Sequence, residues 1–163
     1  MKNVLLLTMF ITASITSTGF AASTLGVDAY AAGTLAQATE KSSLAIGHNA
    51  STTKENGIAI GTNASVNGID SIAIGKAANI AKAGSIVIGR KTTAGELAVS
   101  VGTDSAAMGW GGTAVGTISK ASGVQSTAIG NNAQASETYS TALGISSVAS
   151  GRAANAIGLS KAT

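Results

Sequence analysis

A glycine preceded by an aliphatic residue recurs along most of this 163-residue chain at an almost constant spacing. The distances between successive glycines are 14, 14, 14, 13, 14, 14, 14 and 14 residues. Repetition at a fixed period is typical of solenoids, in which each repeat forms one turn and stacks on the next. The repeated glycines are Gly47, Gly61, Gly75, Gly89, Gly102, Gly116, Gly130, Gly144 and Gly158.

The residues around each glycine alternate in type, as in Ile72-Ala73-Ile74-Gly75. Aliphatic residues flank a small one, which is the period of two expected for a β-strand. A weaker alternation follows each glycine, and polar residues close the repeat. We therefore predict that each repeat forms a strand, a glycine corner, a second strand and a polar return loop. A tenth, degenerate copy can be read at Gly33, and the 13-residue repeat is expected to lack one residue in its return loop near Gly95 and Glu96.

We predict an all-β solenoid of about ten turns, which at roughly 4.8 Å per turn would be about 48 Å long. Each repeated glycine is expected to supply a positive φ or a close backbone passage at the corner. The aliphatic residue before it is expected to point into the core, and the small-residue row of Ala45, Ala59 and Ala73 is expected to face neighbouring chains. The predicted core row is Ile46, Ile60, Ile74, Ile88, Val101, Val115, Ile129, Leu143 and Ile157.

The composition excludes an ordinary globule, because only 3% of the residues are aromatic and 21 are glycine. The formal net charge is +3, with the charged residues scattered singly, so the sequence does not indicate a nucleic-acid partner. The chain contains no cysteine, which excludes disulfides and thiolate metal sites.

The N-terminus has the pattern of a signal peptide. Lys2 precedes an apolar run over residues 4–11, and small residues follow up to Ala21, after which we predict cleavage. The run is shorter than the roughly 20 apolar residues of a transmembrane helix, so we predict no membrane span. The predicted organisation is a signal peptide over 1–21, a lead-in over 22–28 and a repeat domain over 29–163.

We predict no catalytic, cofactor-binding or metal-binding residues. The single histidine, His48, follows a corner glycine and is interpreted as a solvated turn residue. The seven acidic residues do not recur at one phase of the repeat, unlike those of calcium-binding coils. Side chains expected to be available to a ligand are Lys54, Lys82, Trp110, Lys120 and Arg152. For Trp110, a hydrophobic plug over a corner is the alternative interpretation.

The segments SIAIG at 71–75, STAIGNNAQA at 126–135 and STALG at 140–144 resemble the head repeat of YadA-like trimeric autotransporter adhesins. The resemblance extends over residues 29–163. It implies a left-handed parallel β-roll that assembles as a homotrimer. It also implies exposure at the outer membrane of a Gram-negative bacterium and attachment to a host extracellular matrix protein or cell surface.

The chain differs from that family in ending without a heptad-rich stalk or membrane-anchoring strands. We therefore expect a truncated or head-only member, and a secreted protein is an alternative to a surface-attached one. The main functional hypothesis is a non-catalytic adhesive module. A structural spacer or remnant with no ligand of its own is the alternative.

Overall fold

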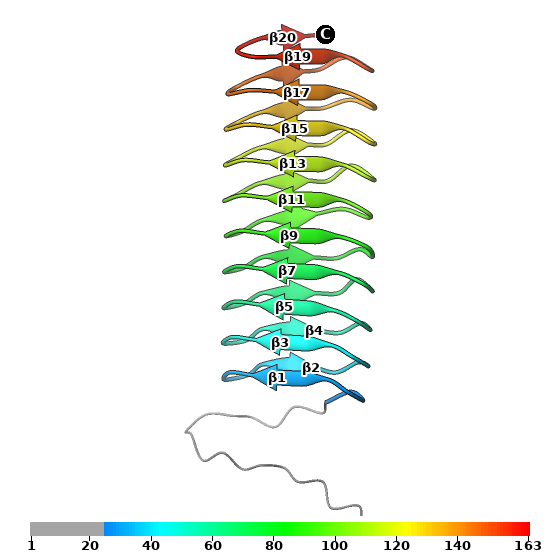
Figure 1. The fold of residues 1–163 in the computed structure, drawn as a ribbon, viewed down its shortest axis with the longest axis vertical. Helices are drawn as coiled ribbons and strands as arrows, with labels where there is room; N and C mark the ends of the chain where they lie inside the picture. Colours follow the sequence, from blue (N-terminus) through cyan, green and yellow to red (C-terminus); the bar gives the residue numbers. More distant parts are fainter. Residues whose placement is uncertain (1–24) are drawn as a thin grey trace, which may run out of the picture.

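The computed structural model describes residues 25–163, which form a parallel β-solenoid of ten turns without a helix (Figure 1). The predicted signal peptide and its cleavage site at Ala21 lie outside the described residues. The coil winds in the left-handed sense, with the odd-numbered strands on the front face of Figure 1 and the even-numbered strands behind them.

Each turn contributes one three-residue strand and one two-residue strand. The odd-numbered strands are β1 Tyr30–Ala32, β3 Leu44–Ile46, β5 Ile58–Ile60, β7 Ile72–Ile74, β9 Ile86–Ile88, β11 Val99–Val101, β13 Thr113–Val115, β15 Thr127–Ile129, β17 Thr141–Leu143 and β19 Asn155–Ile157. The even-numbered strands are β2 Gln37–Ala38, β4 Ser51–Thr52, β6 Ser65–Val66, β8 Asn79–Ile80, β10 Thr93–Ala94, β12 Ala106–Ala107, β14 Lys120–Ala121, β16 Gln134–Ala135, β18 Val148–Ala149 and β20 Lys161–Ala162.

Two ten-stranded parallel sheets result, one from the odd strands and one from the even strands. Equivalent residues of successive turns are paired, as Ile58 is with Ile72 and Ala59 with Ala73. We call the bend after each odd strand the glycine corner and the bend after each even strand the return corner. The stacking satisfies backbone groups at the corners as well, because the amide of Gly75 donates to the carbonyl of Ile60 in the turn below (2.7 Å).

The short repeat is accommodated in a return corner, as predicted. Strand β10 pairs in register with both neighbours, and β11 pairs residue for residue with β9, for example Val99 with Ile86. The missing residue therefore falls in the segment 95–98 between β10 and β11. A deletion inside a strand would have turned its inward side chains outward, so only a corner can absorb it without loss of the core.

The core is built from small side chains, which overturns the predicted orientation of the odd strands. The central residue of each odd strand from β3 to β19 is buried, and Ala45, Ala59 and Ala73 are 0% exposed. This row faces the even strands inside the coil and is not available to neighbouring chains. The residues predicted as the core row instead point outward and are half-buried or exposed: Ile46, Ile60, Ile74, Ile88, Val101, Val115, Ile129, Leu143 and Ile157.

The physical reason is the thinness of the coil. Each odd strand has three residues, so only its central side chain can point between the sheets while the flanking two point away from them. The interior accepts few large side chains, and Ile80, Val66 and Val87 are the largest that are fully buried. Close packing between the sheets therefore requires alanine at most inward positions, and the larger aliphatic residues are left on the outside.

Within residues 25–163 there is no helix of the length and apolar character needed to cross a membrane.

Candidate interaction surfaces

Each glycine corner is closed by a glycine that the backbone itself requires. Gly75 has a φ of 135°, and a Cβ built on it would lie 2.2 Å from the carbonyl oxygen of Gly89 in the next turn. The same positive φ, between 125° and 139°, occurs in every turn from Gly33 to Gly144. At Gly158, in the last corner, φ is 79° and nothing lies near such a Cβ. The corner glycines therefore allow successive turns to approach closely and fix which side chains point outward.

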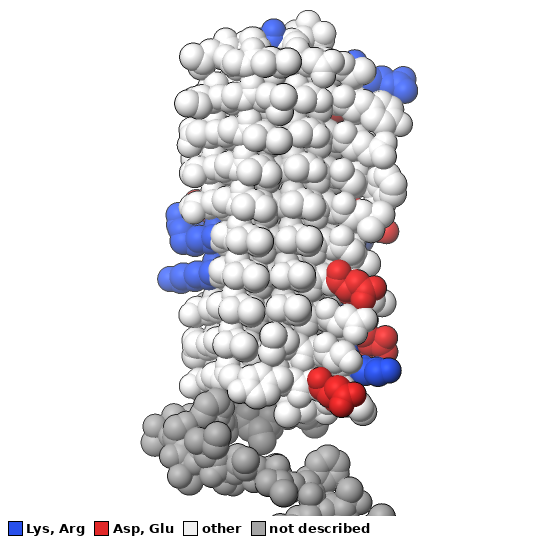
Figure 2. All heavy atoms as spheres, in the orientation of Figure 1, with Lys and Arg blue, Asp and Glu red and all other residues white. Residues whose placement is uncertain are grey.

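The outer face of the odd-strand sheet carries an aliphatic strip, which is two residues wide from β3 to β11 and one residue wide above β11. The first and third residues of each odd strand point outward, and from β3 to β11 all ten are Leu, Ile or Val. None of the outward-facing residues on the ten odd strands is charged. Figure 2 shows this face in front, with the charged side chains confined to its edges. An apolar face of this length is typical of a protein interface.

The outer face of the even-strand sheet has a different chemistry. Each even strand begins with an outward-facing residue, and all of these residues except Ala106 and Val148 are polar. The polar ones are Gln37, Ser51, Ser65, Asn79, Thr93, Lys120, Gln134 and Lys161. Side chains one turn apart form hydrogen bonds beside this face, as between Thr53 Oγ1 and Asn67 Oδ1 (2.7 Å). This face is therefore suited to contact with water or with a polar ligand.

The five side chains predicted to be available to a ligand are all exposed, but they do not form one site. Lys54, Lys82 and Arg152 lie in return corners of well-separated turns, and Lys120 lies on the even-strand face. Trp110 also lies in a return corner and is 45% exposed, so it does not plug the coil.

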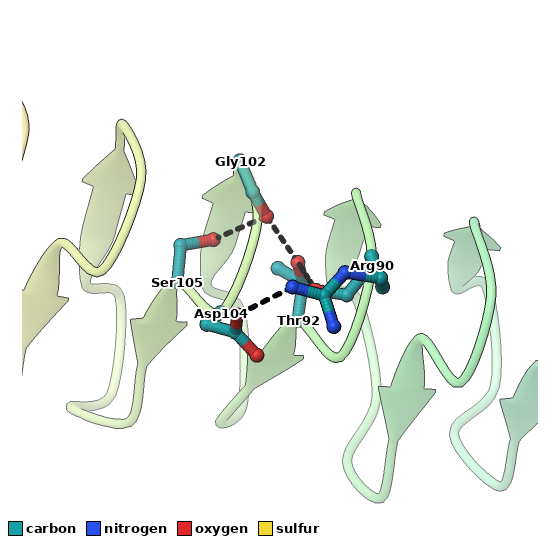
Figure 3. Close-up of polar contacts among 5 residues, drawn as sticks. All are labelled: Arg90, Thr92, Gly102, Asp104 and Ser105. Carbon is teal, nitrogen blue, oxygen red and sulfur yellow. Dashed lines mark hydrogen bonds and ion pairs between the residues drawn. The ribbon is translucent and has the colours of Figure 1, made fainter.

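Glycine corners carry a polar ladder and an ion pair. The amide of Asn49 donates from Nδ2 to Oδ1 of Asn63 one turn above (2.9 Å). Arg90 pairs with Asp104 across one turn at 3.0 Å, as Figure 3 shows, and both side chains are well exposed. In the same corner, the Oγ1 hydroxyl of Thr92 donates to the carbonyl oxygen of Gly102. These contacts link neighbouring turns of the solenoid.

His48 is exposed in a glycine corner. Among residues 25–163, the histidine and the acidic side chains form no cluster of three that could hold a metal ion.

The sequence reasoning missed the aliphatic face of the odd-strand sheet as an exposed surface. One signal could have revealed it. The row between the two aliphatic rows contains Ser100 and is otherwise Ala or Val, and small side chains are what a thin interior accepts.

Comparison with known families supports this description. The profile of the YadA head domain repeat (2 copies) matches residues 25–50, 53–78, 111–133, 121–146 and 135–159. The matched segments cover more than half of the chain, and they coincide with stacked turns of the solenoid. No curated protein sequence matches the chain. The chain therefore belongs to the family of YadA head domain repeats.

Proposed function

We propose that this protein is a non-catalytic adhesive head that works as a homotrimer on the bacterial surface. The observation that carries the proposal is the aliphatic, uncharged outer face of the odd-strand sheet in a chain built from YadA head repeats. Heads of this family are homotrimeric in general and belong to surface-exposed adhesins.

The aliphatic strip supports the trimer. Its two rows of side chains lie about 7 Å apart. The first row is aliphatic over about 24 Å and the second over about 43 Å, which together give a strip of several hundred Å². Monomeric proteins rarely leave an apolar patch of that size in water. Three chains around an axis parallel to the solenoid would bury this strip along its whole length.

The even-strand face supports the adhesive role. If the aliphatic strip lies on the trimer axis, the even-strand face is directed away from the axis. Lys120 on this face then remains available, and Lys54, Lys82 and Arg152 lie in the return corners along the rim where neighbouring chains would meet, at different heights of a rigid rod. A host extracellular matrix protein or a cell surface is the proposed partner, and it would be bound by many weak contacts along the rod.

Export by the N-terminal signal is part of the proposal, because an adhesin must leave the cytoplasm. Lys2, the apolar run over residues 4–11 and the small residues up to Ala21 support it. Mass spectrometry of the exported protein should give a mass that begins at Ala22. Retention of Met1 would contradict this step.

Binding of the purified protein to surfaces coated with collagen, fibronectin or laminin tests the adhesive role. Saturable binding that weakens as salt is added is the expected result, because the available side chains are basic. Sedimentation across micromolar concentrations should show a trimer at the higher concentrations. A trimer that binds none of the three matrices would favour the alternative of a structural spacer, and a monomer at every concentration would contradict the homotrimer.

A further inference from the structure

The aliphatic strip changes character near the middle of the rod. In the first position of the odd strands, Ile72, Ile86 and Val99 are followed by threonine at β13, β15 and β17 and by Asn155 at β19. The third position of the odd strands, next to the glycine corner, is the one that stays aliphatic up to β19. The upper turns therefore offer less apolar surface on this face than the lower turns do.

Apolar side chains appear at the edges of the sheet in these same upper turns. At β13, Trp110 in the return corner and Ile118 in the glycine corner are each 45% exposed. At β17, Tyr139 in the return corner and Ile145 in the glycine corner are 50% and 62% exposed. Each pair flanks a single odd strand, so its two members lie at the same height on opposite edges of the rod.

Most lower turns lack such a matched apolar pair. Val27 and Leu35 form one beside β1, whereas Ile69 and Leu97 in the return corners before β7 and β11 are matched by polar or charged residues in the glycine corners after these strands. Strand β5 is flanked by Glu55 and Asn63, and strand β9 by Lys82 and Arg90. Figure 2 shows the charged side chains of the lower and middle turns along both edges of the aliphatic face.

Two of the apolar edge residues are retained in an unfavourable backbone conformation. Ile118 and Tyr139 have φ values of 59° and 60° at corner positions where most other turns place Asn, Asp, Ser or Gly. For a β-branched or bulky residue this conformation is uncommon and costs about 1–2 kcal/mol. Contact of these two side chains with another chain would offset this conformational cost.

Symmetry identifies where that partner would lie. In a cyclic assembly with its axis parallel to the solenoid, every residue keeps its height, and the glycine corner of one chain faces the return corner of the next. Ile118 then lies level with Trp110 of the neighbouring chain, and Ile145 lies level with Tyr139. An antiparallel pair would instead set each corner type against its own kind at inverted heights, so that Ile118 and Ile145 would face glycine corners of lower turns, which carry exposed polar residues such as Lys76 and His48.

We propose that Trp110 and Tyr139 of one chain pack against Ile118 and Ile145 of a second copy, forming an apolar seam that closes the upper turns of the trimer. This inference rests on the proposed trimer and adds its direction and register. It assigns Trp110 to contact between subunits rather than to a host ligand. The seam replaces apolar contact that the threonines of β13, β15 and β17 cannot supply.

Disulfide trapping tests the seam, since the natural chain contains no cysteine. A disulfide requires Cα atoms within about 7 Å of each other. In the double variant Trp110→Cys/Ile118→Cys, the two cysteines lie at opposite ends of β13 and can bridge only between chains. Mild oxidation should yield covalent dimers and closed trimers on denaturing gels.

The matched control moves one cysteine along the rod. Trp110→Cys/Asn63→Cys uses the same two corner types, but the positions differ by four turns, or about 19 Å in height. This variant should stay monomeric on denaturing gels. Equal cross-linking of the two double variants would overturn the seam, because it would mean that the register is not fixed.

Sedimentation of the unoxidised variants separates the seam from the trimer itself. If the Trp110→Cys/Ile118→Cys variant sediments as a trimer but does not cross-link on oxidation, the seam is overturned and the proposed trimer stays intact. A monomer at every concentration for the unaltered protein would overturn both. As a second measurement, Trp110→Ala should raise the concentration needed for trimer formation at least several-fold, whereas Glu55→Ala at a polar edge should leave it unchanged.

Discussion

The two sheets of the solenoid face the same interior but opposite environments. Inside the coil both contribute mainly alanine, whereas the outer face of the odd strands is aliphatic and that of the even strands is mostly polar. The strand lengths and the pairing are regular in both. The difference teaches that the repeat specifies the fold through its small inward residues and its corner glycines, while the outward residues are free to specify what each face contacts.

The largest effect is expected from a charge on the inner side of the odd-strand sheet. Ala73→Asp would place a carboxylate in a position that is 0% exposed and should destabilise the fold by several kcal/mol. Ile74→Asp changes the next residue, which points outward, and should leave the monomer folded while it weakens association. Thermal unfolding by circular dichroism at a concentration below assembly checks both. Equal melting of the two variants would contradict the inside–outside assignment.

The corner glycine fixes which side chains point inward and which point outward. Its replacement should have the next largest effect on stability. Gly75→Ala would force a φ of 135° on a residue with a Cβ and press that Cβ against the carbonyl of Gly89, at a cost of about 1–3 kcal/mol. Gly57→Ala provides the control, because Gly57 lies in a return corner without a positive φ and its nearest contacts are at 3.2 Å. Denaturant unfolding should show the larger loss for Gly75→Ala, and an equal loss would contradict a special role for the glycine corner.

A polar substitution on the aliphatic strip should separate association from folding. Ile60→Ser/Ile74→Ser should shift the trimer to higher concentrations by at least tenfold, because two buried aliphatic side chains per chain would be lost from the interface. Ser65→Ala/Asn79→Ser alters the same turns on the even-strand face and should leave the trimer unchanged. Sedimentation equilibrium distinguishes the two variants. If both double variants dissociate alike, the odd-strand face is not the interface.

The smallest effect is expected at the exposed ion pair between turns. Arg90→Ala removes the contact with Asp104, and because both side chains are well exposed the loss should stay below about 1 kcal/mol. The difference from the unaltered protein should shrink further in high salt. A loss that persists at high salt, about 1 M, would show that Arg90 contributes through packing rather than charge.

The sequence was sufficient to predict the period, the number of turns and the place of the short repeat, because these follow from spacing alone. It was not sufficient to orient the odd strands. In Ile72-Ala73-Ile74 the alternation is equally compatible with either phase, and the hydrophobicity of isoleucine favoured the wrong one. The deciding quantity is the distance between the two sheets, which a short turn with tight corners makes too small for large side chains at most positions.

The candidate surfaces were harder to predict than the fold for a related reason. Trp110 and Ile118 lie just outside the repeated motif, on either side of β13, and a sequence pattern does not show which residue each would face in an assembly of stacked turns. A sequence pattern that repeats every turn identifies the scaffold, whereas residues that interrupt the pattern in a few turns gain meaning only when the turns are stacked.

Stacking each turn only on its neighbours also determines how the rod would respond to a pulling force. A surface-attached rod under tension along its axis can lose its terminal turn without disturbing the others, because every strand pairs only with the strands one turn away. A released turn of about 14 residues would extend to about 46–50 Å, compared with about 5 Å of rod length while stacked. The coil would then lengthen stepwise and dissipate load, so that a bond at its far end is spared a sudden peak of force.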